Sequence, residues 1–551
     1  MTTTRDDAPA TDAPVPGEPA GVPGANDASC ASDAIDAAGG AHRLRTLVVV
    51  AAGALVVLGI GLRFWARSDL WLDEALTANI ARLPLSHLPA ALRRDGAPPL
   101  YYVLLHGWAG VTGTSDLAVR SLSGVLGCLT LPFVWMAGRR LGGRPVALVA
   151  VVLFATSPFA VRYSTENRMY ALVILLVAMG VVALQRALER PRAGNLVAVG
   201  ACTAGLLYSH YWAFYLVGVT GLWLAFEGRF GPPACRAGAW RALVALGVGC
   251  VAFVPWIPSF LNQLHHTGTP WAEPASFVAL VNAISSFGGG PTSQGRGLAL
   301  LYFALAGFGL FGAARGRFHV DLDLRTRPVG RPLAVAVVGT LCAAVVGGAL
   351  FSSAFQARYA SVVLVPVLLL VALGVATLGD ARVRLGVVAV AVAFGLAGSL
   401  PNVWTSRTQA GQVAAAVDAG ARPGDVVAFC PDQLGPAVDR LLPAGRYRAV
   451  TFPRRTSPAF VDWVDYTAAT KAADPVAFAT YLEGLAGTGH RIWFVWMGGY
   501  QTLGTKCETI GEQLQGDHHF TAQQMVTGVP PTQQLVGYEG MGLLRFTPVP
   551  G

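Results

Sequence analysis

The stretch Trp71-Leu72-Asp73-Glu74 follows the first strongly apolar segment of the chain, residues 46–64. An apolar segment of this length can cross a bilayer as a helix. Two adjacent carboxylates therefore stand where a membrane span meets water, a place that is costly for charge unless the charge has a function. We interpret the rest of the chain as a scaffold that holds Asp73 at the membrane surface.

The composition indicates a polytopic α-helical membrane protein. Of 551 residues, 53% are hydrophobic and only 13% are charged, whereas a soluble protein carries about a quarter charged residues. The net charge of +9 comes almost entirely from arginines in short loops between apolar runs. That distribution sets membrane topology and argues against nucleic-acid binding.

The N-terminal segment is expected to lie in the cytoplasm. Residues 1–42 are rich in Ala, Asp, Pro and Gly and contain no aromatic residue, which predicts a disordered tail. Basic residues at 42–45 precede the first span, and the positive-inside rule then places the tail on the cytoplasmic side.

Further apolar segments follow. The segment 98–112 is too short to span and opens with Pro98-Pro99, so we interpret it as an interfacial helix within a long outer loop, 65–117. Arginine clusters then fall in alternate loops, which the positive-inside rule places in the cytoplasm. Counting 98–112 as a span would place all of these clusters outside. The sequence predicts about eleven spans: 46–64, 118–138, 145–163, 169–187, 195–209, 213–227, 241–258, 297–314, 332–351, 359–378 and 383–400.

The chain changes character after this transmembrane part, residues 43–400. An odd number of spans places residues 401–551 outside, and short β-rich runs alternate there with candidate helices, which predicts a small extracytoplasmic α/β domain. Strands are expected at Val426–Cys430, Arg448–Phe452, Ile492–Trp496 and Leu543–Phe546, and helices near 407–420, 432–441, 475–486 and 507–515. For Cys430 and Cys507, a disulfide and two free thiols are equally compatible with the sequence.

The acidic pair is the first candidate for chemistry. A carboxylate at the outer surface can act as a general base on a hydroxyl group. Alternatively, Asp73 and Glu74 only begin a helix, because acids are favoured in a first turn. Further polar motifs on the same side of the membrane favour a functional pair.

Those further motifs add a second acid and two cations. Glu166 and Arg168 lie between two spans, where they either contact a sugar hydroxyl and a phosphate or close a turn. Arg358 begins a span on the outer side and either binds a phosphodiester or snorkels at the interface. The remaining candidates for donor binding on this face are Asp95, Tyr101, Tyr102, Tyr170, His210 and Tyr359. The stretch 95–102 is explained equally well by a helix entry with proline in the first turn, and an aromatic belt at the membrane interface explains most of 208–212.

Together these groups suit attack of a hydroxyl on a sugar whose leaving group is a lipid phosphate. A base activates the acceptor, and arginines stabilise the departing phosphate. The reaction does not strictly need a metal, although participation of a divalent cation stays open. Asp321-Leu322-Asp323 has the form used with nucleotide sugars but stands alone in an Arg-rich cytoplasmic loop. The adjacent His265 and His266 cannot easily share one metal ion.

The motifs resemble those of the integral membrane C-type (GT-C) glycosyltransferases, in the branch of protein O-mannosyltransferases and aminoarabinose transferases. The resemblance covers about 46–400 and rests on Asp73-Glu74, the stretches 95–102 and 163–170, and Ala357-Arg358-Tyr359. It implies a polyprenyl-phosphate-sugar donor, an external active site and Asp73 as the base, with Glu166 as the second acid.

Two positions depart from the family pattern. Ala97 stands where relatives usually carry His or Lys before the two prolines, and Asn167 where many carry Ala between Glu and Arg. The change at Ala97 leaves the phosphate to Arg168 and Arg358, or indicates an altered donor or lost activity.

The C-terminal region and the Arg-rich composition resemble those of actinobacterial members, which implies mannose or arabinose as the sugar, with mannose favoured. We expect a bacterial plasma-membrane enzyme with a cell-envelope glycan, lipid or protein as acceptor. A lipid-linked sugar or polysaccharide transporter and an inactive acceptor-binding homologue remain alternatives. A transporter would place polar residues near mid-membrane, whereas here they gather at the outer surface.

Overall fold

A computed structural model describes residues 25–268, 276–350, 355–516, 519–529 and 538–549. The chain forms two compact units that divide after Ala54. Residues 1–24 of the predicted tail lie outside the described residues. The remainder of that tail is not irregular as expected, because α1 runs over Ala25–Leu62. Alanine is the best helix former, and the alanines of this stretch allow the helix to begin before the apolar run.

Each predicted span overlaps one helix or a run of consecutive helical segments. Within the described residues, eight helices are long and apolar enough to cross a membrane. This confirms a polytopic helical fold, while the count of eleven stays a prediction. After α1, the helices at the predicted spans are α5 (Asp116–Thr156), α6 (Pro158–Ser164), α7 (Tyr170–Glu189), α8 (Ala193–Leu207), α9 (Ala213–Phe230), α10 (Pro233–Val251), α13 (Ser293–Phe311), α14 (Arg331–Ala334) with the π-helix η2 (Val335–Gly339) and α15 (Thr340–Leu350), the 3-10 helix η3 (Ala357–Val363) with α16 (Leu364–Thr377), and α17 (Ala381–Ser399).

Two glycine positions shape this bundle. Helix α5 contains the predicted span 118–138 and the first part of 145–163, and a non-helical break at Gly142 and Gly143 separates them; Gly143 has φ +76°, a conformation that glycine adopts readily. Helix α16 is buried almost throughout and packs against α13 and α5. A Cβ added at Gly374 would clash with the Leu305 carbonyl oxygen, so the small residue allows the close approach of α16 and α13.

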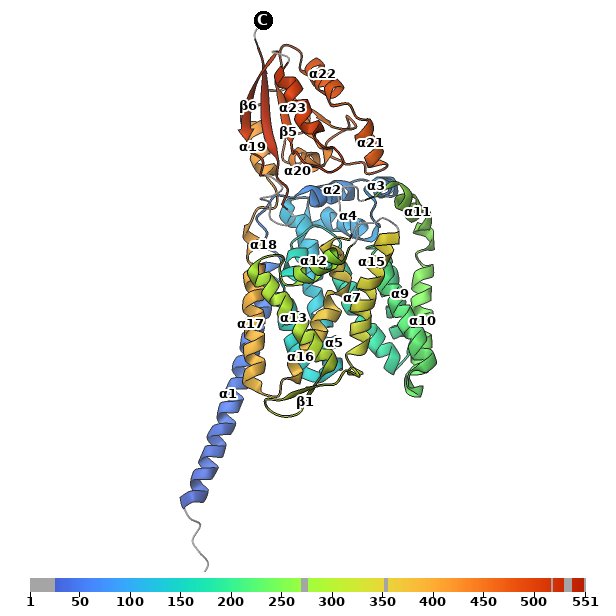
Figure 1. Ribbon diagram of the computed structural model, residues 1–551, viewed down its shortest axis with the longest axis vertical. Coiled ribbons are helices and arrows are strands. Elements are labelled where there is room, and N and C mark those ends of the chain that lie inside the picture. The colour runs from blue at the N-terminus through green and yellow to red at the C-terminus, as the bar shows by residue number, and fades with distance from the viewer. Residues whose placement is uncertain (1–24, 269–275, 351–354, 517–518, 530–537, 550–551) are drawn as a thin grey trace, which may run out of the picture. The chain divides into compact units, whose positions relative to one another are not determined.

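The predicted outer loop 65–117 contains three helices, α2 (Leu72–Ala81), α3 (Leu88–Asp95) and α4 (Leu100–Thr112). The last is the helix expected at 98–112. In Figure 1, α2 and α4 lie across the ends of the bundle helices, beneath the C-terminal region. The predicted loop 259–296 holds two helices that the sequence did not indicate, α11 (Ile257–His266) and α12 (Phe277–Phe287). A short hairpin of β1 (Gly312–Ala314) and β2 (Val320–Leu322) follows α13.

The C-terminal region forms a five-stranded sheet in the order β4-β3-β5-β7-β6. The strands are β3 (Val426–Cys430), β4 (Arg448–Thr451), β5 (Ile492–Trp496), β6 (Phe520–Val526) and β7 (Gly542–Pro548). Strand β3 pairs in parallel with β4 and β5, whereas β7 is antiparallel to β5 and β6. The accompanying helices are α18 (Pro401–Trp404), α19 (Ala410–Gly420), η4 (Asp432–Leu434), α20 (Gly435–Asp439), α21 (Tyr466–Ala472), α22 (Pro475–Ala486) and α23 (Lys506–Gly516).

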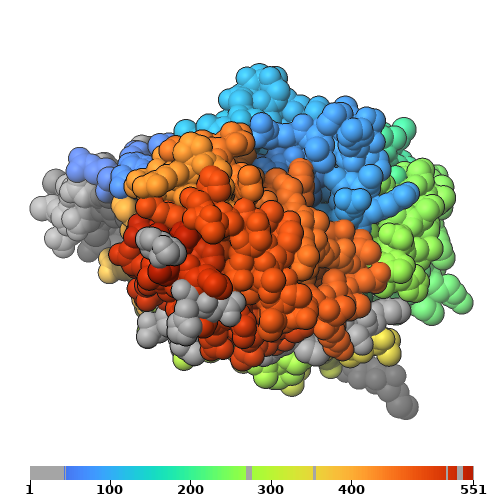
Figure 2. Space-filling model, turned by 90° about the horizontal axis from the view of Figure 1, so that it is seen from above, coloured from blue at the N-terminus to red at the C-terminus, as the bar shows by residue number. Residues whose placement is uncertain are grey.

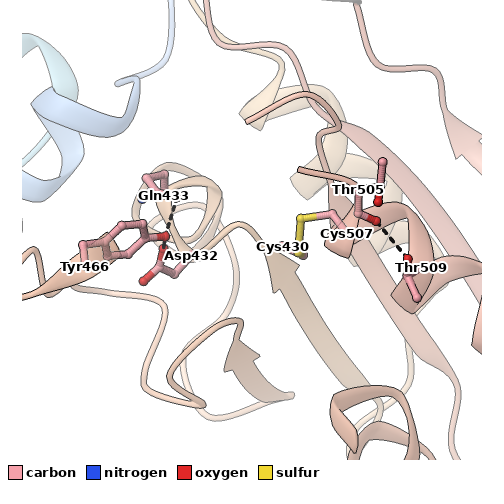
Figure 3. Close-up of a disulfide and its surroundings, with 7 residues drawn as sticks. All are labelled: Cys430, Asp432, Gln433, Tyr466, Thr505, Cys507 and Thr509. Carbon is pink, nitrogen blue, oxygen red and sulfur yellow. Dashed lines mark hydrogen bonds between the residues drawn. A yellow bond between two sulfur atoms is a disulfide. The ribbon is translucent and has the colours of Figure 1, made fainter. Parts of the chain in front are cut away.

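A disulfide joins β3 to α23 in this region. Cys430 and Cys507 are bonded with their Cα atoms 5.5 Å apart (Figure 3). Of the two alternatives that the sequence left open for these cysteines, the structure therefore shows the disulfide. Seen from above, the C-terminal region, coloured orange to red, covers much of the visible face. The blue residues of the outer loop 65–117 lie beside it (Figure 2).

Candidate functional site

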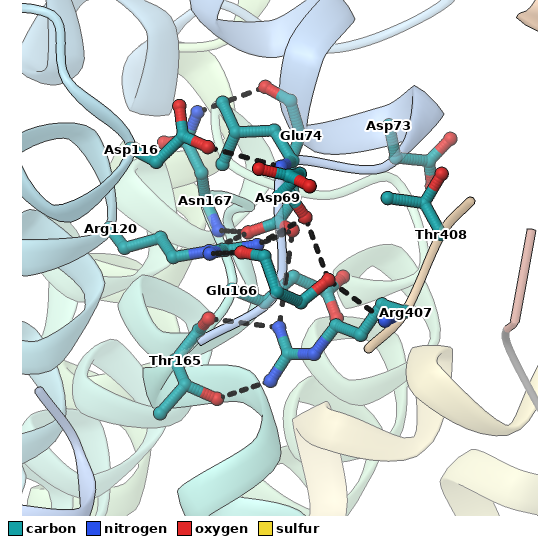
Figure 4. Close-up of polar contacts among 12 residues, drawn as sticks. Asp69, Asp73, Glu74, Asp116, Arg120, Thr165, Glu166, Asn167, Arg407 and Thr408 are labelled. Atoms are coloured by element: carbon teal, nitrogen blue, oxygen red, sulfur yellow. Dashed lines mark hydrogen bonds and ion pairs between the residues drawn. The ribbon is translucent and has the colours of Figure 1, made fainter. Parts of the chain in front are cut away.

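The two acids that begin α2 have different environments. On a helix, successive side chains point about 100° apart, so neighbours face different partners. The Asp73 side chain keeps 16% of its surface exposed, whereas Glu74 is fully buried. In Figure 4, Asp73 lies apart from the contacts that hold Glu74. The structure therefore divides the predicted acidic pair into one accessible and one inaccessible carboxylate.

Two arginines converge on the accessible carboxylate. Arg358, at the start of the segment η3–α16, donates from Nη1 to Oδ2 of Asp73 at 2.9 Å. Arg168 lies on the turn before α7, with its Nε 4.0 Å from the same oxygen. Arg168 is oriented by a second bond, from Nη1 to the Thr77 Oγ1 at 2.8 Å. A carboxylate and two fixed cations thus share one partly exposed place.

Asp95 and Tyr102 form the next part of this cluster. Tyr102 donates to Asp95 Oδ2 at 2.5 Å, and Arg168 reaches the Tyr102 hydroxyl at 3.5 Å. Burial raises the pKa of Asp95, and the charge of Arg168 opposes that rise. Within the predicted stretch 95–102, the pair of Asp95 and Tyr102 therefore contacts Arg168, the arginine that faces Asp73.

Aromatic rings lie beside this polar group. The His210 ring is 5.7 Å from the Tyr170 ring and 5.1 Å from the Tyr359 ring, centroid to centroid. Burial lowers the pKa of His210 to about 3, with further lowering by Arg168 and Arg358. His210 is therefore neutral at physiological pH, and its Nδ1 accepts from the Trp212 amide at 3.1 Å.

Glu74 is anchored inside the protein. Arg120 donates to both of its oxygens, at 2.7 and 2.5 Å, and the Asn167 amide donates at 2.8 Å. Burial opposes the charged form, but the charge and hydrogen bonds of Arg120 outweigh it and hold the pKa of Glu74 below its usual range. With both oxygens bound, Glu74 reaches a substrate only if this ion pair breaks.

Glu166 belongs to the same buried cluster. Its Oε2 lies 3.2 Å from the Nε of Arg162, and its side chain is 1% exposed. Burial raises the pKa of Glu166, while Arg162 lowers it. Figure 4 places Glu166 near Arg407 and away from Asp73. Of the predicted site residues, the structure brings Asp95, Tyr102, Arg168, Tyr170, His210, Arg358 and Tyr359 to the Asp73 side; Glu74, Glu166 and Tyr101 lie in the buried cluster.

The two departures from the family pattern have structural consequences. The Asn167 side chain donates to the Glu74 carbonyl at 3.1 Å and accepts from Tyr101 at 3.1 Å, contacts that alanine could not make. Ala97 is buried, and its carbonyl accepts from Gln263 at 3.3 Å. The cations nearest the accessible acid are therefore Arg168 and Arg358.

Several residues of this region were not predicted. They are Arg120, Asn167, Arg407, Thr408 and Glu539, which hold α2 and the turn before α7. Three of them lie after residue 400, and no local pattern marked them. Within the ranges that the structure describes, no three His, Cys, Asp or Glu side chains gather as a metal site would require.

The fold and site define a multi-pass helical membrane protein with an acid and two arginines at one end of its bundle. Residues 96–258 match the family model described as dolichyl-phosphate-mannose-protein mannosyltransferase. This match covers less than half of the chain and includes the turn with Glu166 and Arg168. No curated protein sequence matches the chain.

Solved structures give the fold. Crystal structures of ArnT from Cupriavidus metallidurans, bound to undecaprenyl phosphate and in the apo state, match with TM-scores of 0.55 and 0.57 at 13% and 14% identity; each match covers 92% of this chain and 98% of that chain. The S. cerevisiae Pmt1–Pmt2 complex bound to the sugar donor matches over 41% of this chain and 36% of that chain, with 18% identity and a TM-score of 0.33. The chain has the GT-C fold, which confirms the fold class predicted from the sequence.

Proposed function

We propose that this protein transfers a sugar from a polyprenyl-phosphate donor to a cell-envelope acceptor on the extracytoplasmic face of a bacterial plasma membrane, with Asp73 as general base. The observation that carries the proposal is the cluster of Asp73, Arg168 and Arg358. One partly exposed carboxylate beside two fixed guanidinium groups supplies both a proton acceptor and stabilisation for a phosphate.

The reaction follows from these charges. The acceptor hydroxyl oxygen attacks the anomeric carbon while Asp73 takes the hydroxyl proton. The bond from that carbon to the phosphate oxygen breaks, and the lipid phosphate leaves while Arg168 and Arg358 stabilise its negative charge. Direct displacement inverts the anomeric centre. Because Asp73 pairs with Arg358 in the free protein, a bound phosphate competes for this arginine and frees the carboxylate to accept the proton.

The donor class is supported by the proteins that this chain resembles. The matched family is described by dolichyl-phosphate-mannose, and one ArnT structure is described as bound to undecaprenyl phosphate. Both carriers are polyprenyl phosphates, and a guanidinium pair suits their common phosphate group. Mannose is the favoured sugar and arabinose the second choice. The disulfide between Cys430 and Cys507 supports an outward-facing C-terminal region.

The test is sugar transfer by the purified protein in liposomes. The donor is polyprenyl-phosphate mannose, or in a parallel reaction polyprenyl-phosphate arabinose, with the label in the sugar. A cell-envelope extract serves as the acceptor. We expect label to move from the lipid to the envelope fraction with the mannose donor, and not with a free labelled sugar. A folded protein that moves label from neither lipid donor would contradict the proposal.

A further inference from the structure

The helix that carries Asp73 begins without a capping side chain of its own. The first amides of a helix need hydrogen-bond acceptors from outside the helix. Trp71 occupies the N-cap position of α2, but an indole can only donate. The acceptor comes from the far end of the chain, because the Leu72 amide donates to Oε1 of Glu539 at 3.3 Å across 467 positions.

Glu539 is itself held in place. Its Oε2 accepts from the Thr408 hydroxyl at 2.6 Å. Its backbone amide donates to the Arg407 carbonyl at 2.8 Å, and its carbonyl accepts from the Gln409 amide at 3.0 Å. These backbone bonds form a parallel bridge between two segments of the C-terminal region. The cap is therefore a fixed element and not a loose side chain.

The segment 407–409, which pairs with Glu539, also contacts the turn before α7, which carries Arg168. Arg407 donates to the Thr165 carbonyl at 2.9 Å and to its hydroxyl at 2.6 Å, as Figure 4 shows. Thr165 belongs to the turn that carries Arg168. Residues 407–409 and 539 thus contact both elements that deliver charged groups to the candidate site.

We propose that Glu539 is a positioning residue, which fixes the first turn of α2 and thereby sets the place of Asp73 relative to Arg358, so that the C-terminal region completes the active site. This inference rests on the proposed function. Asp73 is the residue directly after the amide that Glu539 binds. Either protonation state of Glu539 leaves an oxygen that can accept from the Leu72 amide, and the helix dipole adds stabilisation when the carboxylate is ionised.

The charges around Glu539 add a pH dependence. Burial raises the pKa of Glu539 to about 8, with smaller contributions from the charges of Asp73 and Glu74 and against the lowering effect of the hydrogen bonds from Thr408 and the Leu72 amide. Tyr538 is adjacent in sequence, and Arg407 lies on the paired segment. Glu539 is therefore mostly protonated at pH 7. Its ionisation at higher pH adds a negative charge close enough to Asp73 for the two charges to interact, which should weaken binding of an anionic donor.

Three variants of the full-length protein test the proposal. Glu539→Gln keeps an acceptor oxygen but cannot ionise, Glu539→Ala removes the cap, and Glu512→Gln makes the same change at an exposed position of α23 as a control. The measurements are kcat and the KM for polyprenyl-phosphate mannose from pH 6 to pH 9, together with hydrogen exchange of residues 72–76.

A small displacement of a catalytic group can lower the rate by about 10²-fold, so we expect Glu539→Ala to lower kcat about 10- to 100-fold and to speed exchange at the start of α2. Glu539→Gln should keep most of kcat at pH 6.5 and lack the rise in KM that we expect of the wild type as Glu539 ionises near pH 8.

The proposal is overturned if Glu539→Ala behaves like Glu512→Gln in both kcat and hydrogen exchange. A global loss of folding in Glu539→Ala would leave the decision to the folded Glu539→Gln variant, whose pH profile must differ from that of the wild type. If the wild type transfers no sugar at all, the proposed function fails, and the hydrogen exchange of residues 72–76 still shows whether Glu539 fixes α2.

Discussion

Arg358 donates a 2.9 Å hydrogen bond to Asp73 across 285 positions of sequence. The acid stands on the first helix after the first span, whereas the arginine begins the segment that leads into the buried helix α16. The pair therefore forms only when the bundle has closed. Because both side chains keep a similar exposed fraction, 17% and 16%, a ligand phosphate can reach the guanidinium without unfolding the site.

Replacing Arg358 by lysine tests its role in donor binding. Lysine keeps the charge but loses the planar fork that fits a phosphate. A hydrogen bond to a charged group contributes about 1.5–3 kcal/mol, so Arg358→Lys should raise the KM for the lipid donor about 10- to 100-fold. Initial rates against donor concentration measure this, with Arg315→Lys on the exposed hairpin as control. An unchanged KM in Arg358→Lys would assign the phosphate to other residues.

Glu74 should matter for folding and not for chemistry. Glu74→Gln leaves the buried Arg120 without its ionic partner, and breaking a buried pair costs about 3–5 kcal/mol. We expect a lower thermal unfolding temperature for Glu74→Gln, a similar loss for Arg120→Gln, and a double variant that loses less than the sum. Tryptophan fluorescence in detergent follows the unfolding. A Glu74→Gln protein with wild-type stability and no activity would instead place Glu74 in the reaction.

The stability of the C-terminal region should fall as pH rises. Burial raises the pKa of Asp432 to about 7, although its hydrogen bond from Tyr466 acts against this. The folded form holds the Asp432 proton more tightly than the unfolded chain does. The stabilisation that results from this difference is fully present below about pH 4 and is lost as pH rises through about 7. One pKa unit corresponds to about 1.4 kcal/mol.

Asp432→Asn should flatten this dependence only in part, because Glu539 titrates in the same direction. Thermal unfolding at pH 5 and pH 8 compares the wild type with Asp432→Asn and with Asp418→Asn, an exposed control. If the wild type and Asp432→Asn lose stability equally between these pH values, Asp432 is not the group responsible.

The disulfide gives a test of both stability and sidedness. Removing a disulfide typically costs about 2–5 kcal/mol, and this bond closes a separation of 77 residues. Cys430→Ser with Cys507→Ser should therefore lower the unfolding temperature of the C-terminal region. Thiol alkylation in intact cells should leave both native cysteines unmodified until a reductant is added. Labelling without reductant would contradict the disulfide, and with it the argument from that bond for an extracytoplasmic location.

Local sequence features predicted the helices well because span length, apolarity and arginine placement are properties of single segments. The buried strands β3 and β5 were predicted because each is a short continuous apolar run, which is also a property of a single segment. Strand β6 was missed because it is a largely exposed edge strand with the polar sequence Phe520–Val526, which lacks the alternation of a half-buried strand.

The site was predicted in part. Asp73, Arg168 and Arg358 stood out because each is a charge at an outer membrane surface. The separation of Glu74 from Asp73 could not be predicted, since it depends on the partners that α2 meets after folding. The contacts of Glu539 and Thr408 likewise join segments more than 300 positions from α2, and no periodic pattern records such a contact.

The most direct measurement is sugar transfer by Asp73→Asn beside the wild type, from labelled polyprenyl-phosphate mannose in liposomes. Asp321→Asn makes the same change at an exposed aspartate and controls for it. Loss of a general base should lower kcat about 10²–10⁴-fold, with thermal unfolding and the Cys430–Cys507 bond unchanged. Equal transfer by Asp73→Asn and the wild type would contradict the account, since Asp73 could then not be the base.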